Sequence, residues 1–263
     1  MCTLTLAWNV LPGTPVAAAA NRDEALDRPS EPPRVRPREG DVPGVVAPRD
    51  VRAGGTWVGC TDEGLYVTIT NRWLDAEIDG DRSRGLLVDE CLRRSSPRAA
   101  AEYVRGELAE RAYAGFFLIL ADRTDAFLLA YDGELETVRL DPGVHVVSNV
   151  GGILAGTPRF SIPDRRREPG VRRRESAVRL FEHLRLDSHD GGANDADAEA
   201  WTRRAREALA DHDFGACVHG DGYGTRSGTV VRVGTGIDVE YADGPPCRTE
   251  YEPIEIPDSW PRP

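Results

Sequence analysis

The alternation of apolar and polar segments at the beginning of the chain predicts a β-hairpin. An apolar run covers Leu4–Val10, Pro12-Gly13 indicates a turn, and a second apolar run covers Val16–Ala20. Two short apolar runs joined by a tight turn are typical of antiparallel strands. The second run ends in the polar group Asn21-Arg22-Asp23-Glu24, which the hairpin would bring back beside Cys2.

Apolar runs elsewhere in the chain predict further strands and helices. The predicted strands cover residues 64–72, 116–121, 126–131, 135–140, 145–148, 228–233, 237–241 and 249–256. The predicted helices cover residues 84–94, 97–113, 172–186 and 200–210. Residues 28–48, rich in Pro, Arg and Glu, are expected to form an irregular surface connection, and the acidic segment 187–199 a solvated loop.

The order of these elements predicts a layered α+β fold. Short spacings between the strands from 116 to 148 indicate an antiparallel meander. Strands at both ends of the chain, with helix pairs between them, favour a sheet packed on a sheet with helices on the outside. We expect one domain over residues 1–256 and a tail at 257–263.

The composition is ordinary for a globular protein, and its charge bears on the class of partner. With 44 acidic and 33 basic residues the net charge is −11, which argues against general nucleic-acid binding. Every basic residue is arginine, which we interpret as a sign of a salt-adapted organism. Five widely spaced cysteines without a CxxC pair favour a reducing cytoplasm. Because no apolar run reaches the length of a membrane span, we expect a soluble cytoplasmic protein.

Cys2 is the candidate nucleophile. If Met1 is removed, Cys2 carries a thiol and a free α-amine on one residue, and these can act as nucleophile and general base. Arg22 would lower the pKa of the thiol, and Asp23 would hold the amine in position. The alternative is that Cys2 is an ordinary strand residue and that Asn21–Glu24 forms a solvated, salt-bridged turn.

Other segments offer candidate binding groups. Asn71 and Asn149 each end an apolar strand, where a side-chain amide could donate to a developing oxyanion, although asparagine is also a common turn former. In Gly54-Gly55-Thr56-Trp57, the glycines could let the backbone approach a ligand beside Trp57. The same residues could equally form a glycine bulge with a packed tryptophan.

No metal or nucleotide site is predicted. The five histidines show no metal-binding spacing, and Cys217-x-His219 offers two ligands without a third. The segment Gly222–Gly228 leads into a strand and lacks both lysine and the spacing of a phosphate loop. The arginines at 165–167 and 172–174 could bind an anion, but a solvated helix start is the favoured interpretation.

Several of these segments together resemble the NRDE family, which is the transport and Golgi organization protein 2 family. They extend from the N-terminus to about Val233. The motifs are Met1-Cys2, Ala20-Asn21-Arg22-Asp23-Glu24 with Arg28-Pro29, Gly54-Gly55-Thr56-Trp57, Thr70-Asn71, Ser83-Arg84-Gly85, Ser148-Asn149 and Tyr223-Gly224-Thr225-Arg226.

This resemblance implies the fold of an N-terminal nucleophile (Ntn) hydrolase, a four-layer αββα sandwich. The pattern is similar to that of the cysteine acylases of bile-salt and penicillin amides, which expose a catalytic cysteine by removing the initiator methionine. Carried over onto this chain, it implies catalytic roles for Cys2, Arg22, Asp23, Asn71, Asn149 and Arg226. Asn21 and Trp57 are expected to contact the substrate.

The resemblance leaves two functions open. The first is hydrolysis of a non-peptide amide through a thioester at Cys2, without a cofactor. The second is non-enzymatic trafficking of haem or a lipid metabolite, because members of the family have been implicated in haem trafficking and lipid homeostasis. In that case Cys2 or a histidine would contact the haem iron, and arginines would contact its propionates.

Overall fold

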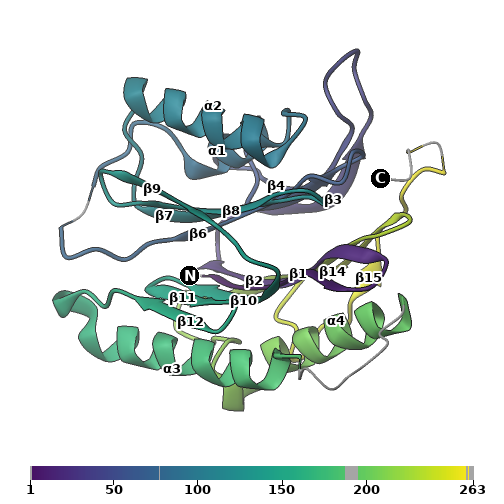
Figure 1. The fold of residues 1–263 in the computed structure, drawn as a ribbon. Coiled ribbons are helices and arrows are strands. Elements are labelled where there is room, and N and C mark those ends of the chain that lie inside the picture. Colours follow the sequence, from purple (N-terminus) through teal and green to yellow (C-terminus); the bar gives the residue numbers. More distant parts are fainter. Residues whose placement is uncertain (1, 77, 187–194, 259, 261–263) are drawn as a thin grey trace.

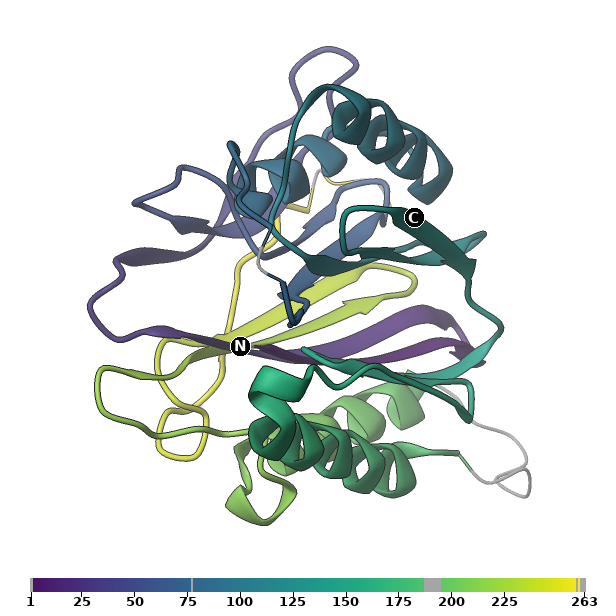
Figure 2. The same ribbon diagram turned by 90° about the vertical axis from the view of Figure 1, so that its left-hand side faces the viewer.

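Two antiparallel β-sheets lie face to face in the computed structural model, and a pair of helices covers the outer surface of each (Figure 1). The structure describes residues 2–76, 78–186, 195–258 and 260. Seen from the side, the two helical layers lie on opposite sides of the paired sheets (Figure 2). This arrangement confirms the predicted four-layer αββα sandwich. No helix among the described residues is both long and apolar enough to cross a membrane.

The first sheet has the strand order β12-β11-β10-β1-β2-β13-β14-β15. Its strands are β1 (Cys2–Leu11), β2 (Thr14–Ala25), β10 (Gly143–Ser148), β11 (Gly151–Leu154), β12 (Thr157–Phe160), β13 (Tyr223–Val233), β14 (Ile237–Ala242) and β15 (Glu252–Pro253). The predicted hairpin is therefore confirmed as β1 and β2, two central strands of this sheet.

The second sheet has the strand order β3-β4-β5-β6-β7-β8-β9. Its strands are β3 (Ser30–Arg36), β4 (Val45–Asp50), β5 (Val58–Thr61), β6 (Tyr66–Asn71), β7 (Phe116–Ala121), β8 (Ala126–Tyr131) and β9 (Leu135–Arg139). Strands β6 to β9 pair in sequence order, so the predicted meander is present up to β9.

In the part of the chain that the structure describes, four α-helices form the outer layers: α1 (Arg84–Cys91), α2 (Pro97–Glu110), α3 (Arg167–Leu184) and α4 (Asp195–Ala210). Helix α2 begins as its sequence predicts, because the Ser96 side chain accepts a hydrogen bond from the backbone N–H of Ala99 and Pro97 occupies the first turn. Short 3₁₀ helices, η1 (Asp164–Arg166) and η2 (His212–Phe214), precede α3 and follow α4.

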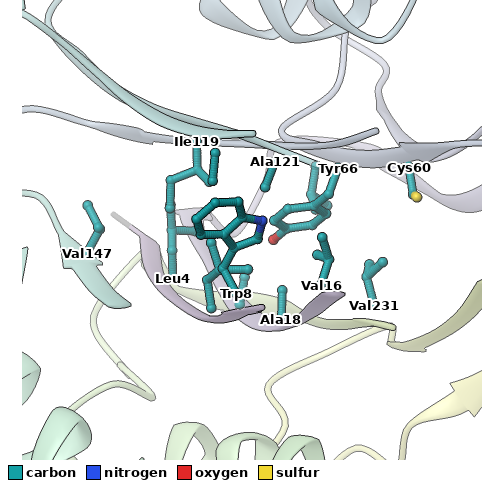
Figure 3. Close-up of a cluster of buried hydrophobic side chains, with 14 of the residues drawn as sticks. Leu4, Trp8, Val16, Ala18, Cys60, Tyr66, Ile119, Ala121, Val147 and Val231 are labelled. Atoms are coloured by element: carbon teal, nitrogen blue, oxygen red, sulfur yellow. The ribbon is translucent and has the colours of Figure 1, made fainter. Parts of the chain in front are cut away.

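Three apolar layers separate the four structural layers. Between the sheets, Leu4, Trp8 and Ala18 of the first sheet face Ile119 and Ala121 of the second (Figure 3). A second cluster lies between the second sheet and α1 and α2, and a third between the first sheet and α3 and α4. The alanine run at 17–20 suits β2, because alternate residues face the sheet–sheet layer and the helical layer and both faces are buried.

Three predictions of local structure are wrong. The segment 28–48 contains strands β3 and β4, although Pro32 and Pro33 favoured an irregular connection. Proline is tolerated there because β3 is an edge strand and its pairing with β4 shifts register between Glu31 and Arg34. Strand β10 leaves the meander and pairs with β1 in the other sheet. The expected acidic loop at 187–199 is wrong for residues 195–199, which belong to α4. Its other part, 187–194, lies outside the described residues.

Candidate functional site

Cys2, Arg22 and Asp23 lie together at one end of the first sheet. Cys2 and Arg22 are directly opposite each other in the β1–β2 register, so their side chains lie on the same face of the sheet. All three residues line a cavity of about 200 Å³. The hairpin thus brings the polar group at the end of β2 back to Cys2, as the sequence predicts.

Arg22 is buried and held from two sides. Its Nη2 donates to Oδ2 of Asp50, on β4 of the second sheet, at 3.1 Å. Its guanidinium carbon lies 4.0 Å from the centre of the Trp57 ring, which also lines the cavity. Its Nη1 has no hydrogen-bond partner among the described residues. Arg22 is therefore a fixed cation with one unengaged donor group, and Trp57 lines the cavity beside it.

Asp23 is a buried carboxylate with partners from distant parts of the chain. Thr225 donates its hydroxyl to Oδ1 at 2.6 Å, and Arg173 of α3 donates to Oδ2 at 3.2 Å. Burial raises the pKa of Asp23, and the charge of Arg173 opposes that rise. Arg173 is thus a buried partner of the site, which corrects the interpretation of its arginine cluster as merely a solvated helix start.

The environment of Cys2 raises the pKa of its thiol overall. Cys2 is half-buried, and burial is the largest influence, raising the pKa of its thiol above the usual value. The Asp23 carboxylate also raises this pKa, whereas Arg22 lowers it, as expected from its charge. Desolvation outweighs the guanidinium, so the net pKa of the thiol is raised although Arg22 acts on it in the predicted direction.

The two predicted oxyanion donors have different environments. Asn71, at the end of β6, lines the cavity. Asn149 is fully buried, and its Nδ2 donates to the hydroxyl of Thr70 at 3.0 Å and to the carbonyl of Asn71 at 2.7 Å. Thr70 in turn donates to the carbonyl of Cys2 at 3.3 Å. The amide of Asn149 is therefore engaged in holding the strand ends around Cys2 and does not line the cavity.

Two further predicted residues face elsewhere. Asn21 is buried, and its Nδ2 donates to the carbonyls of Leu209 and Ala216, so it fastens the end of α4 and does not face the cavity. Arg226 lies where the β2–β13 register shifts, and its Nη1 donates to the carbonyl of Leu26. Asn21 precedes Arg22 on β2 and so lies on the opposite face of the sheet, whereas Arg226 has no paired residue in the β2–β13 register.

Arg84 lines the cavity, as do Arg28 and Arg82, and none of these three was selected from the sequence as a site residue. Arg84 begins α1 and donates from Nη1 to the carbonyl of Gly115 at 2.7 Å. Arg84 and Cys2 line the same cavity; burial lowers the pKa of Arg84, and the Cys2 sulfur opposes this shift. The signal was present in the motif Ser83-Arg84-Gly85, although no role was attached to it.

The glycine motif has a structural explanation. A Cβ on Gly55 would lie 2.1 Å from the carbonyl carbon of Gly85, and the N–H of Thr56 donates to the Gly85 carbonyl at 3.0 Å. Gly54 has a φ of +82°, in the region that favours glycine. The two motifs therefore pack backbone against backbone, and this contact brings Trp57 and Arg84 to the same cavity.

A larger cavity of about 600 Å³ adjoins the first, and both are lined by Asn71, Gly80, Arg84 and Ala114. Its walls combine apolar side chains with arginines. The apolar members are Trp73, Leu74 and Ile78, and the charged members are Arg72, Arg84, Arg165, Arg166 and Asp79. Positive groups therefore outnumber negative ones in this cavity, in contrast to the acidic composition of the whole chain.

The layer order and strand pairing define an αββα protein with the fold of the N-terminal nucleophile hydrolases. Penicillin V acylase from Agrobacterium tumefaciens has a similar structure, with a TM-score of 0.59 and 15% sequence identity over 97% of this chain and 86% of that one. The mutant C2A of conjugated bile acid hydrolase from Clostridium perfringens has a TM-score of 0.53 and 11% identity, covering 98% of this chain and 97% of that one.

At the level of sequence, the model of the Transport and Golgi organisation 2 family matches residues 1–243. The chain therefore belongs to this family, which confirms the resemblance seen in its motifs. The Transport and Golgi organization protein 2 homolog of Bos taurus is 29% identical over 232 residues, which cover 82% of this chain and 80% of that protein.

Proposed function

We propose that this protein is a cysteine amidohydrolase that cleaves a non-peptide amide through a thioester at Cys2. The observation that carries the proposal is the placement of Cys2, Arg22 and Asp23 in one cavity, with the cysteine paired directly to the arginine. The fold supports it, because proteins named as acylases and hydrolases share the same arrangement of layers. Cleavage of the Met1–Cys2 bond would release the amine that the reaction requires.

The reaction has two stages, acylation and deacylation of Cys2, and each stage includes two proton transfers. The amine of Cys2 accepts the thiol proton, and Sγ adds to the amide carbonyl carbon to form a tetrahedral oxyanion. The resulting ammonium gives its proton to the leaving nitrogen as the C–N bond breaks, which releases an amine and leaves a thioester. Water then adds to the thioester and gives a proton to the amine. Collapse breaks the C–S bond and releases the carboxylic acid, and the ammonium of Cys2 gives its proton to the departing sulfur, which restores the thiol and the free amine.

The surrounding residues supply the charges that these steps need. Asp23, fixed by Thr225 and Arg173, would orient the Cys2 amine and stabilise its protonated form. The Nη1 of Arg22, without a partner among the described residues, is available to the substrate. Asn71 would donate its side-chain amide to the oxyanion, which is supported by its position in the cavity wall and by the engagement of Asn149 elsewhere.

The adjoining cavity indicates the class of substrate. Its apolar wall suits a hydrocarbon or ring portion, and its arginines suit a carboxylate or another anionic group. We therefore expect the substrate to be an amphiphilic amide that carries a negative charge a short distance from the scissile bond. Haem or lipid trafficking, the other function suggested by the sequence, stays a prediction.

Acyl transfer to Cys2 is the direct test of this function. Purified protein is incubated with a panel of N-acyl amides, quenched in acid, and digested for mass spectrometry of the N-terminal peptide. We expect an acyl group on Cys2 and release of the free amine, both abolished in Cys2→Ala and retained in the control Cys91→Ala, whose thiol lies at the buried end of α1. Amine release that persists in Cys2→Ala would contradict the proposed function.

A further inference from the structure

Four potential metal ligands outside the Cys2 site converge on one point. They are His212, Cys217, His219 and Cys247, and their ligand atoms all lie within 4.8 Å of one another. Three of them come from the connection between α4 and β13, and Cys247 comes from the segment between β14 and β15. The sequence reveals only the pair Cys217-x-His219, so the premise that no further ligand accompanies this pair does not hold in the structure.

The three distances from His219 to the other ligands are close to those of ligands around a tetrahedral ion. The Nε2 of His219 lies 3.2 Å from Nε2 of His212, 3.2 Å from Sγ of Cys247 and 3.6 Å from Sγ of Cys217. Tetrahedral zinc with its usual bond lengths to nitrogen and sulfur separates neighbouring ligand atoms by about 3.3–3.8 Å. Three contacts to one atom thus agree with this geometry to within a few tenths of an ångström.

Hydrogen bonding alone does not explain this convergence. A neutral imidazole Nε2 carries either one hydrogen or one lone pair, so it makes a single good hydrogen bond. Here three polar atoms approach the same Nε2 from different residues. A cation at the centre would receive a lone pair from each of the four side chains and would explain why the ligand atoms point toward one another.

We propose that His212, Cys217, His219 and Cys247 form a structural Cys₂His₂ zinc site. Two thiolates and two imidazoles are a donor set that favours Zn²⁺ over the hard cations Mg²⁺ and Ca²⁺. Four protein ligands complete the tetrahedron and leave no position for a reacting water, which assigns the site to folding. The ion would join the loop before β13 to the loop after β14.

The position of this site links it to the geometry around Asp23. Val218 lies between two of the ligands, and its N–H and carbonyl bond to the hydroxyl and N–H of Thr225, at 2.9 and 2.8 Å. Thr225 in turn donates to Asp23 at 2.6 Å. A metal that fixes residues 217–219 would therefore also fix the threonine that holds this carboxylate.

Metal content is the first measurement. Protein purified under reducing conditions is analysed by elemental mass spectrometry, and metal-depleted wild-type protein is titrated with Co²⁺. We expect one zinc per chain, and with Co²⁺ the visible bands of a tetrahedral ion together with a thiolate charge-transfer band. Absence of zinc binding, or a Co²⁺ spectrum of an octahedral site without thiolate bands, would overturn the proposal.

Variants assign the metal to these side chains. The double variant Cys217→Ser, Cys247→Ser should lose its zinc, whereas Asp213→Ala, an exposed change in the same 3₁₀ helix, should keep one equivalent. A chelator should lower the Tm of the wild-type protein but not that of the double variant. Zinc retained by the double variant, or a Cys217–Cys247 disulfide in the wild-type protein instead of zinc, would refute the assignment.

Discussion

At the residue scale, the half-buried thiol of Cys2 and the fixed cation of Arg22 line the same cavity. Cys2 has a raised pKa because it is buried beside Asp23, and Arg22 is the nearby side chain that opposes the rise. The balance between these influences decides how much thiolate exists near neutral pH. The arginine is therefore expected to tune the reactivity of the cysteine in addition to contacting the substrate.

Replacing Arg22 should shift the pH dependence of Cys2 alkylation. In Arg22→Met the positive charge is lost, so the pKa of the thiol rises further and the midpoint of the rate–pH profile moves to higher pH. The measurement is the iodoacetamide labelling rate of the Cys2 peptide between mildly acidic and strongly basic pH. Arg28→Met is the matched control, because Arg28 also bonds Asp50 but is not among the charges that act on Cys2. An unshifted Arg22→Met profile would refute this role.

His145 gives the fold a defined sensitivity to acid. Its ring is buried in β10, and this burial lowers its pKa to about 4, although the backbone and charge of Asp141 oppose the shift. The unfolded chain takes up a proton at the ordinary histidine pKa while the folded chain does not. The stability that depends on neutral His145 is thus complete above pH 6.5 and is lost as the pH falls toward 4.

The variant His145→Leu should remove this part of the acid sensitivity. We expect the wild-type free energy of unfolding to fall by about 3 kcal/mol more than that of the variant across this pH range. Urea denaturation at several pH values measures the difference. Parallel stability curves for the two proteins would contradict the assignment.

How much of the site the sequence predicts depends on the separation of the residues along the chain. The grouping of Cys2, Arg22 and Asp23 follows from one hairpin, whose length and turn are readable in the hydrophobic pattern. Arg173 reaches the site from helix α3, and Asp50 reaches it from strand β4 of the second sheet. No local sequence pattern encodes such long-range contacts. Asn149 was expected to line the cavity, but buried hydrogen bonds direct its amide to Thr70 and Asn71 instead.

At the element scale, charged groups join the two sheets near Cys2. Asp50 at the end of β4 accepts from Arg22 on β2 at 3.1 Å and from Arg28 at 2.6 Å. Burial raises the pKa of Asp50, but the bonds from Arg28, the Ala53 N–H and the charge of Arg22 outweigh it, so the net pKa is lowered. This contact fixes the second sheet against the first beside the cavity.

Loss of this carboxylate should destabilise the protein strongly. In Asp50→Ala the buried guanidinium of Arg22 loses its partner, and breaking a buried pair from one side costs about 3–5 kcal/mol. Asp132→Ala is the control, because its pair with Arg72 is more exposed and such pairs contribute about 0–1 kcal/mol. Chemical denaturation at neutral pH compares the variants. Equal losses in both would show that the sheets are not held together at Asp50.

Several elements were readable from the sequence and others were not. The apolar strands β7 and β8 have the predicted boundaries, because continuous apolar runs bounded by turns are a strong signal. Strand β3 is polar, contains two prolines and lies at an edge, so its pattern resembles a loop. The partner sheet of β10 also could not be read, because strand pairing depends on the path of the intervening chain.

At the scale of the whole molecule, an acidic protein encloses a basic cavity. The chain carries a net charge of −11, yet four arginines and one aspartate line the larger cavity. Arg166 lies over the Trp73 ring at 5.1 Å, which holds its charge beside the apolar wall. Such a cavity would favour anionic ligands that the rest of the surface repels.

Selectivity for an anionic amide can be tested with one cavity arginine. In Arg166→Ala we expect the KM for a carboxylated amide to rise about tenfold, in keeping with the loss of one charge-assisted hydrogen bond, with little change for its neutral methyl ester. Arg167→Ala is the control, since Arg167 is exposed, pairs with Asp164 and does not line the cavity. Equal effects on the acid and the ester would contradict the predicted selectivity.

The central claim is that the Met1–Cys2 bond is cleaved and that the Cys2 sulfur is then a reactive nucleophile. The most direct measurement is mass spectrometry of the N-terminal peptide of protein isolated from its native cells, after brief alkylation of the folded protein. We predict a peptide that begins at Cys2, with a free amine and an alkylated sulfur, while the buried Cys60 and Cys91 stay unmodified. A peptide that keeps Met1, or a Cys2 no more reactive than those two buried thiols, would contradict the account.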